Sequence, residues 1–171
     1  MNVARFLHLE IDAPKAPPTE EELSAIEAAV GEPLPKELVE FLAVANGGKL
    51  DYIFELATEA GPFPLCFYTI YSTRRPFPGR APGGLILHEL EVERRLKDLR
   101  AGLLPIAADG GTSVLYVDLD RERYGRVVGY VEGLPGWDGT PEGCFVDLAP
   151  GLAGFLSALF LNTVEEPKRG G

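Results

Sequence analysis

The residues of this sequence best suited to catalysis are its two histidines, because general acid–base catalysis most often uses an imidazole. His8 lies in a loosely alternating N-terminal segment, and His88 lies at the start of an expected helix. Neither has a recognisable nucleophile beside it, and the Gly-x-Ser-x-Gly motif of serine hydrolases does not occur. We therefore interpret both histidines as structural and assign no catalytic residue.

Metal chemistry would need carboxylates at a suitable spacing, and Asp118 and Asp120 offer one such pair. Alternation along a strand would place both carboxylates on one face, where a cation could bridge them. At the tip of a hairpin, however, such a pair is more typical of turn chemistry and solvation. We assign no metal ligand and no cofactor, and an enzyme that uses Asp109, Asp118 or Asp120 with a metal ion remains the third hypothesis.

The run Asp-Gly-Gly-Thr-Ser at residues 109–113 is glycine-rich, as phosphate-binding loops are. It lacks the Gly-Lys-Ser/Thr ending of those loops, and a strand rather than a helix is expected to follow it. This run is therefore predicted to be a turn.

Two loops contain residue types that favour binding. Residues 74–84 hold three prolines, three glycines and three arginines, and guanidinium groups pair well with carboxylates. Residues 134–143 hold the only tryptophan, a residue type enriched at the energetic centres of interfaces. A structural role is the alternative for each residue of the candidate partner-binding set, which is Arg74, Arg75, Arg80, Trp137 and Asp138.

The elements that would position these loops follow from the period of the apolar residues. A capping box, Thr19 with Glu22, begins the first helix. The patterns predict helices over residues 20–30, 35–45, 87–100 and 152–160, with the run Asn46-Gly47-Gly48 ending the second of them. They also predict strands over 50–56, 65–72, 103–107, 114–119 and 126–131. Gly61-Pro62 and Pro64 are expected to turn the chain between the first two strands, and residues 120–125 to form a hairpin turn between the last two. Phe145 and Val146 form only a brief apolar stretch. Strands grouped between opening and closing helices predict an α+β fold, a mainly antiparallel sheet with two N-terminal helices, one central helix and a C-terminal helix.

Length and composition favour one globular domain. The chain has 171 residues, of which 46% are hydrophobic and 25% charged, the balance of an ordinary folded protein. We predict an N-terminal arm at residues 1–18, a single domain at 19–162, and a flexible tail at 163–171.

The charge restricts the kind of partner. The net charge is −10, and it is distributed as −8 over residues 1–72, +2 over 73–126 and −4 over 127–171. Such a field repels phosphate backbones and anionic lipid, so we expect neither nucleic-acid nor membrane binding. Within the third expected helix, two acid–base pairs at i,i+4 spacing, Glu91 with Arg95 and Glu93 with Lys97, explain the local charges without catalysis.

The chain shows no sign of secretion. Charge interrupts the N-terminus before an apolar signal-peptide core forms, and no apolar stretch approaches the roughly 20 residues of a membrane helix. Cys66 and Cys144 lie in apolar runs, far apart in the sequence, and whether they pair is left open. We expect a cytoplasmic protein.

Three stretches of the sequence carry a resemblance to a known family. The first comprises Ile26-Glu27, Gly31, Leu34-Pro35, Leu38, Phe41-Leu42 and Asn46-Gly47-Gly48. The second comprises Leu104-Pro105-Ile106-Ala107, Asp109-Gly110-Gly111 and the strand at 114–118. The third comprises Gly125-Arg126-Val127-Val128 and Phe155-Leu156.

In this order and spacing, the three stretches resemble the SUKH superfamily, which includes bacterial immunity proteins and fungal cell-wall assembly regulators. The chain departs from that pattern in its N-terminal arm and in the proline-rich loop at 74–84. The resemblance implies an α+β domain without enzymatic activity, and many bacterial relatives bind and neutralise a cognate toxin. Because the matching positions are mainly scaffold residues, the resemblance assigns no interface.

The leading hypothesis is therefore a non-enzymatic protein-binding domain, an immunity protein whose partner is a basic toxin domain. The second hypothesis, suggested by the fungal branch, is a regulatory or small-molecule-binding domain linked to the cell envelope. The oligomeric state is left open.

Overall fold

A computed structural model describes residues 6–74, 83–97, 99–134 and 144–161. The helices are α1 (Glu20–Val30), α2 (Lys36–Leu42), α3 (Ile86–Leu96) and α4 (Leu152–Ser157). The strands are β1 (Gly48–Lys49), β2 (Tyr52–Thr58), β3 (Gly61–Leu65), β4 (Thr69–Ile70), β5 (Leu103–Ala108), β6 (Val114–Asp118), β7 (Val127–Val131), β8 (Cys144–Ala149) and β9 (Phe160–Leu161). This arrangement confirms the predicted α+β fold with two N-terminal helices, one central helix and a C-terminal helix.

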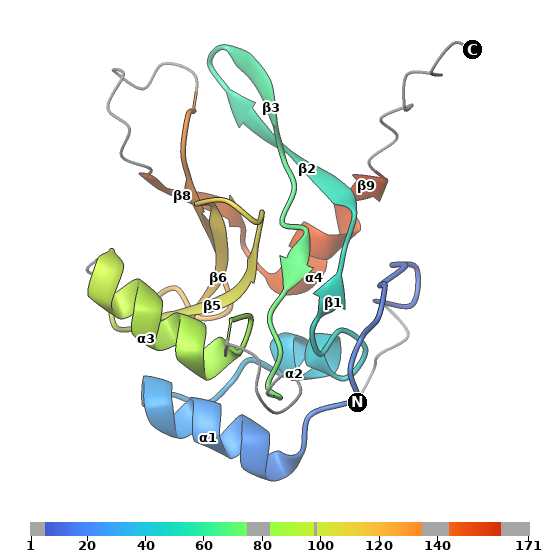
Figure 1. Ribbon diagram of the computed structural model, residues 1–171. Coiled ribbons are helices and arrows are strands. Elements are labelled where there is room, and N and C mark those ends of the chain that lie inside the picture. Colours follow the sequence, from blue (N-terminus) through green and yellow to red (C-terminus); the bar gives the residue numbers. More distant parts are fainter. Residues whose placement is uncertain (1–5, 75–82, 98, 135–143, 162–171) are drawn as a thin grey trace.

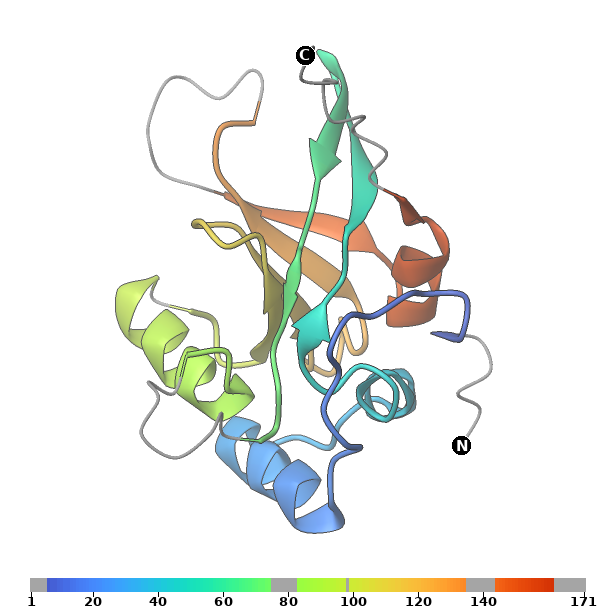
Figure 2. The same cartoon turned by 45° about the vertical axis from the view of Figure 1, so that its right-hand side comes forward.

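The strands form two antiparallel sheets. One has six strands in the order β1-β4-β5-β6-β7-β8, and the other has three in the order β3-β2-β9. Figure 1 shows α3 and α4 on opposite sides of the six-stranded sheet, while the β2–β3 hairpin projects away from the helices. The hairpin projects in the same way in Figure 2. The molecule thus has a helix-rich end and, opposite it, the tip of a two-stranded projection.

The first helix forms as its sequence predicts. The Thr19 Oγ1 accepts the Glu22 backbone N–H at 3.2 Å, and the Glu22 carboxylate accepts the Thr19 N–H at 2.9 Å. This capping box satisfies two backbone donors that the first turn leaves unpaired. Gly31 ends the helix at a φ of 80°, in the left-handed region that glycine adopts without steric cost.

Several elements differ from the sequence prediction. The strand predicted over 65–72 is limited to β4, and the helices predicted over 35–45 and 87–100 end earlier, at Leu42 and Leu96. Pro62 and Pro64, expected to turn the chain, lie within β3, and the turn falls at residues 59–60. The brief apolar stretch around Phe145 is part of β8, a six-residue strand paired with β7. The last helix ends at Ser157, and Phe160 pairs with β2 instead of continuing the helix.

One continuous apolar core joins the elements. It includes the N-terminal segment, because Phe6 and Leu9 are buried. Cys66 and Cys144 are both free thiols. No helix among the described residues is long and apolar enough to cross a bilayer.

Candidate functional site

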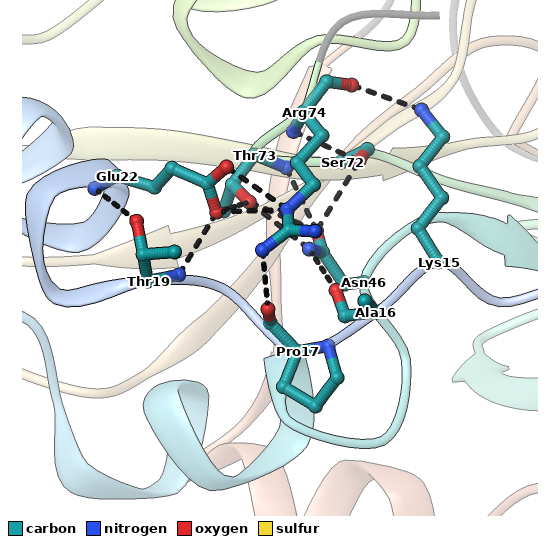
Figure 3. Close-up of polar contacts among 9 residues, drawn as sticks. All are labelled: Lys15, Ala16, Pro17, Thr19, Glu22, Asn46, Ser72, Thr73 and Arg74. Atoms are coloured by element: carbon teal, nitrogen blue, oxygen red, sulfur yellow. Dashed lines mark hydrogen bonds and ion pairs between the residues drawn. The ribbon is translucent and has the colours of Figure 1, made fainter.

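The structure places one of the five predicted partner-binding residues. Arg74 lies four residues beyond the end of β4, at the point where the proline-rich loop begins. The other four, Arg75, Arg80, Trp137 and Asp138, lie outside the described residues. The geometry of the site is therefore that of the loop's base, where four segments of the chain meet around Asn46 (Figure 3).

Asn46 is fully buried and holds three of those segments together. Its amide nitrogen donates to the Ala16 carbonyl oxygen at 2.8 Å and to the Thr73 hydroxyl at 3.0 Å. Its amide oxygen accepts from the Thr73 backbone N–H at 2.8 Å and from the Ser72 hydroxyl at 3.2 Å. Because a buried amide left without partners is costly, this set of bonds favours one arrangement of the segments.

The two glycines after Asn46 make the close approach possible. Gly48 has a φ of 101°, and a Cβ atom added there would lie 2.6 Å from the Asp12 carbonyl oxygen. A Cβ at Gly47 would lie 3.1 Å from the Ser72 Cβ. The sequence predicted that this Asn-Gly-Gly run ends a helix, but α2 has already ended at Leu42. The glycines instead let β1 pack closely against the N-terminal segment at Asp12.

Arg74 is engaged by the domain itself. Its Nε atom donates to the Glu22 carboxylate at 2.9 Å, and its Nη2 atom donates to the Pro17 carbonyl oxygen at 3.0 Å. The Arg74 carbonyl oxygen in turn accepts from the Lys15 ammonium at 2.9 Å. With its side chain only 35% exposed, Arg74 fixes the start of the loop.

Glu22 has several stabilising partners besides Arg74. Partial desolvation would raise the pKa of its carboxyl group, but the Thr19 backbone N–H, the Thr73 hydroxyl and the Arg74 guanidinium outweigh it and lower the pKa. The Thr73 hydroxyl lies 2.9 Å from the carboxylate. Glu22 is therefore held ionised as part of the scaffold.

The far end of the loop is fixed to the near end by backbone bonds. The Ser72 N–H donates to the Gly84 carbonyl oxygen at 2.7 Å, and the Ile86 N–H donates to the Ser72 carbonyl oxygen at 2.9 Å. The Gly84 N–H also donates to the Glu89 carboxylate at 2.7 Å. The two ends of residues 73–83 are thus held side by side, which shortens the span that this segment must close.

The aspartate pair considered for metal chemistry faces arginine. The fully buried Asp118 carboxylate lies 2.5 Å from the Arg100 Nη2 atom and 2.8 Å from the Arg123 Nε atom. Asp120 pairs with the same Arg100 guanidinium. The prediction that both carboxylates share one face is therefore confirmed, and the cation between them is Arg100. Among the described residues, no group of three or more His, Cys, Asp or Glu side chains is gathered as metal ligands would be.

The glycine-rich run at 109–113 forms the predicted turn. The Asp109 N–H donates to the Ser113 carbonyl oxygen at 3.1 Å, and the Asp109 carboxylate accepts the Gly111 N–H at 2.7 Å. The turn connects β5 to β6. As for the histidines, His8 is exposed in the N-terminal segment and His88 is half-buried in the first turn of α3.

An aromatic cluster that the sequence analysis missed lies on the α3 side of the six-stranded sheet. The Phe145 ring centroid is 5.1 Å from that of Tyr130 and 5.8 Å from that of Tyr116. The Lys97 Nζ atom lies 4.2 Å from the Tyr130 ring centroid and 2.9 Å from the Glu93 carboxylate. The Glu93–Lys97 ion pair confirms one of the two predicted i,i+4 pairs. The aromatic members lie on three different strands, so no local pattern reveals them.

A small apolar cavity lies on the other side of that sheet, between it and α4. Its volume is about 20 Å³, and its lining includes Phe41, Tyr52, Ile106, Leu115 and Phe155. That space holds about one water molecule, and the apolar walls offer it few partners. This cavity therefore gives no support to the small-molecule hypothesis.

Most of the chain matches one known protein family. Residues 17–158 match the SMI1 / KNR4 family (SUKH-1). The chain belongs to this family. No curated relative matches the sequence.

Membership of the SUKH-1 family confirms the resemblance seen in the sequence and covers nearly all the elements described above. The matched range begins at residue 17, just before the α1 capping box, and ends just after α4. It therefore includes Asn46, its partners Ser72 and Thr73, and the loop that follows them, whereas Lys15 and Ala16 lie just before the matched range. SUKH-1 proteins are commonly immunity proteins.

Proposed function

We propose that this SUKH-1 domain acts by binding another protein, and that it is an immunity protein that neutralises a cognate toxin without catalysing a reaction. The observation that carries the proposal is the family match over residues 17–158, because proteins of this family are commonly immunity proteins. The partner we propose is a toxin domain with a basic surface.

The charge of the chain supports this partner. A net charge of −10 attracts a positively charged protein and raises its rate of association. A toxin that acts on nucleic acid needs a basic surface to hold phosphates. An acidic protein docked there would compete with the nucleic acid for that surface.

The use of the buried carboxylates also supports a non-catalytic role. Asp118 pairs with two arginines, and Glu93 pairs with Lys97 while it accepts a hydrogen bond from Tyr116. A general base or a metal ligand needs lone pairs available to substrate or ion. Here these lone pairs bind side chains of the domain itself.

For the partner-binding residues, the proposal keeps the two loops that the sequence singled out. Arg75 and Arg80 follow Arg74, whose contacts fix where their loop begins. Trp137 and Asp138 belong to the segment that joins β7 to β8. We propose that Arg75, Arg80, Trp137 and Asp138 contact the partner and that Arg74 positions the first of these loops.

The test is co-expression with the toxin encoded by a neighbouring gene, followed by titration of the purified proteins. Growth should be restored, and toxin activity should fall linearly to zero at one equivalent of the domain. Stoichiometric inhibition distinguishes binding from catalytic inactivation, which would need far less than one equivalent. Arg75→Ala with Arg80→Ala, and separately Trp137→Ala, should weaken binding while the unfolding transition is unchanged. If the domain neither binds the neighbouring toxin nor protects cells from it, the proposal is wrong.

A further inference from the structure

The three-stranded sheet has one face that points away from the core. Its register places Ile53 opposite Phe160, and Glu55 opposite Pro64, so these side chains share one face. Phe160 is 43% exposed, and Glu55 and Pro64 are exposed as well. The alternate residues of β2 point to the core. We call this surface the outer face, and its side chains are Ile53, Glu55, Ala57, Pro62, Pro64 and Phe160.

The edge beside the outer face is unsuited to pairing with another strand. β3 forms this edge, and Pro62 and Pro64 each lack a backbone N–H. Prolines on an edge strand are a common means of preventing strand addition. The side chains of the outer face, rather than the β3 edge, are therefore the part of this sheet that is suited to contact another protein.

The charges of this region have one sign. The three strands and the β2–β3 turn contain no lysine or arginine, whereas Glu55 lies on the outer face and Glu59 lies in the turn, both exposed. A second copy of the chain would bring identical carboxylates together, and like charges at an interface are costly. A basic surface would instead supply the missing counter-charges.

We propose that the outer face docks a basic protein, with an aliphatic or aromatic side chain of that partner packed on Ile53 and Phe160 and its lysines or arginines paired with Glu55 and Glu59. This inference rests on the proposed function, because it gives the partner proposed above a further contact surface, apart from the loop that begins at Arg74. An apolar centre with a charged rim is the usual composition of such interfaces. The apolar pair supplies the buried contact, and the carboxylates supply orientation and attraction.

The outer face can be tested separately from the arginine loop. The Asn46 network includes Glu22 of α1, and α1 lies at the opposite end of the molecule from the β2–β3 hairpin tip in both views (Figures 1 and 2). Variants of one region therefore leave the other intact. Exposed positions also tolerate substitution with little effect on folding.

The first experiment uses a defined probe and needs no toxin. Isotope-labelled full-length protein is titrated with the tripeptide Lys-Trp-Lys, which joins two cationic groups to one aromatic ring, and backbone amide shifts are followed by NMR. We expect the largest shifts at Ile53, Glu55 and Phe160, and their loss in Glu55→Lys and in Phe160→Ser. Largest shifts elsewhere, for example at Phe145, would overturn the inference.

The second experiment measures the affinity for the neighbouring toxin at two salt concentrations. Glu55→Lys and Phe160→Ser should each weaken binding by about tenfold or more, and added salt should reduce the difference for the charge variant. The matched controls are Glu122→Lys, an exposed acid in the β6–β7 turn, and Leu96→Ser, an apolar side chain 69% exposed at the end of α3. Circular dichroism and unfolding midpoints verify that all four variants fold.

The outcomes separate this inference from the proposed function. If the wild type binds the toxin and both outer-face variants bind equally well, the toxin docks elsewhere and only the surface assignment is wrong. If the wild type does not bind the toxin but the tripeptide selects the outer face, the surface stands and the toxin is not its partner. A dimer in sedimentation that Phe160→Ser dissociates would assign the face to a second copy and overturn the inference.

Discussion

The α3 side of the six-stranded sheet and the outer face of the three-stranded sheet use the same residue types in opposite ways. On the α3 side, which we call the paired face, Asp118 lies between two guanidinium groups and Glu93 between an ammonium and a phenol. On the outer face, Glu55 lies in a sheet whose strands contain no base. Charges that find their partners within the chain stabilise the fold, whereas charges without such neighbours are suited to a second molecule.

The aromatic residues of the two regions show the same contrast. Phe145 on the paired face is 44% exposed, yet its ring contacts Tyr116 and Tyr130. Phe160 on the outer face is exposed to a similar degree, 43%, and lies beside Ile53 in the register of β2 and β9. Exposure alone therefore does not distinguish a structural aromatic residue from a binding one, and the neighbours of each ring do.

The comparison predicts that the largest loss of stability follows from replacing Asp118, on the paired face. Asp118→Ala leaves two arginines without their shared counter-charge and should lower the free energy of unfolding by about 3 kcal/mol. The matched change on the outer face, Glu55→Ala, should alter it by less than about 0.5 kcal/mol. Urea unfolding followed by circular dichroism measures both values.

A conservative variant sharpens the result for Asp118. Asp118→Asn keeps the volume of the side chain and the oxygen that accepts the Asp120 N–H at 3.1 Å, but it removes the charge. It should be intermediate between the wild type and Asp118→Ala. Equal stability of Asp118→Ala and Glu55→Ala would mean that the arginine pairs contribute nothing and that the comparison fails.

The next effect in size is expected at Glu93, the other buried acid of the paired face. Glu93 is 6% exposed, and its removal leaves the Tyr116 hydroxyl and Lys97 without their common acceptor. Glu93→Ala should cost about 2 kcal/mol of unfolding free energy. A double-mutant cycle of Glu93→Gln with Lys97→Met should give a coupling free energy of about 1 kcal/mol. A coupling of zero would mean that this ion pair does not contribute to stability.

The sequence predicted the features that depend on neighbours along the chain. The Thr19–Glu22 capping box, the turn at 109–113 and the shared face of Asp118 and Asp120 were all found as expected. Each of them is set by residues within about five positions, where helix and strand periods fix the geometry. The fold class followed from the order of those elements.

Features that depend on tertiary partners could not be predicted. Arg74 was expected to be available for binding, but its partner Glu22 lies 52 positions away in the sequence. β8 was not predicted, because its pairing with β7 rather than a strong local pattern defines it. Pro62 and Pro64 were expected to turn the chain, since nothing local indicates that their strand lies at a sheet edge.

The smallest effect on stability is expected only in alkaline solution. It arises at Tyr116, on the paired face, and has no counterpart on the outer face. Burial and the adjacent Glu93 carboxylate raise the pKa of the Tyr116 phenol well above its ordinary value of 10.0. Below pH 10 both the folded and the unfolded chain keep this proton, so its contribution to stability is complete there. Above pH 10 the unfolded chain loses the proton while the folded chain keeps it, and stability falls by about 1 kcal/mol per pH unit. Urea unfolding between pH 8 and pH 11 measures this slope.

Two variants assign that slope to its cause. Tyr116→Phe should remove the contribution of Tyr116 to the slope of stability with pH. A shallower slope should remain, because burial also raises the pKa of Tyr71. Glu93→Gln removes the carboxylate that disfavours the phenolate and so lowers the pKa of Tyr116, but burial, the larger cause, remains, so the slope should change less than in Tyr116→Phe. Glu55→Gln, on the outer face, should leave the slope as it is in the wild type. A slope in Tyr116→Phe equal to that of the wild type would show that the buried Tyr116 phenol does not cause the alkaline loss of stability, and the distinction between the two faces would then rest on the ion pairs alone.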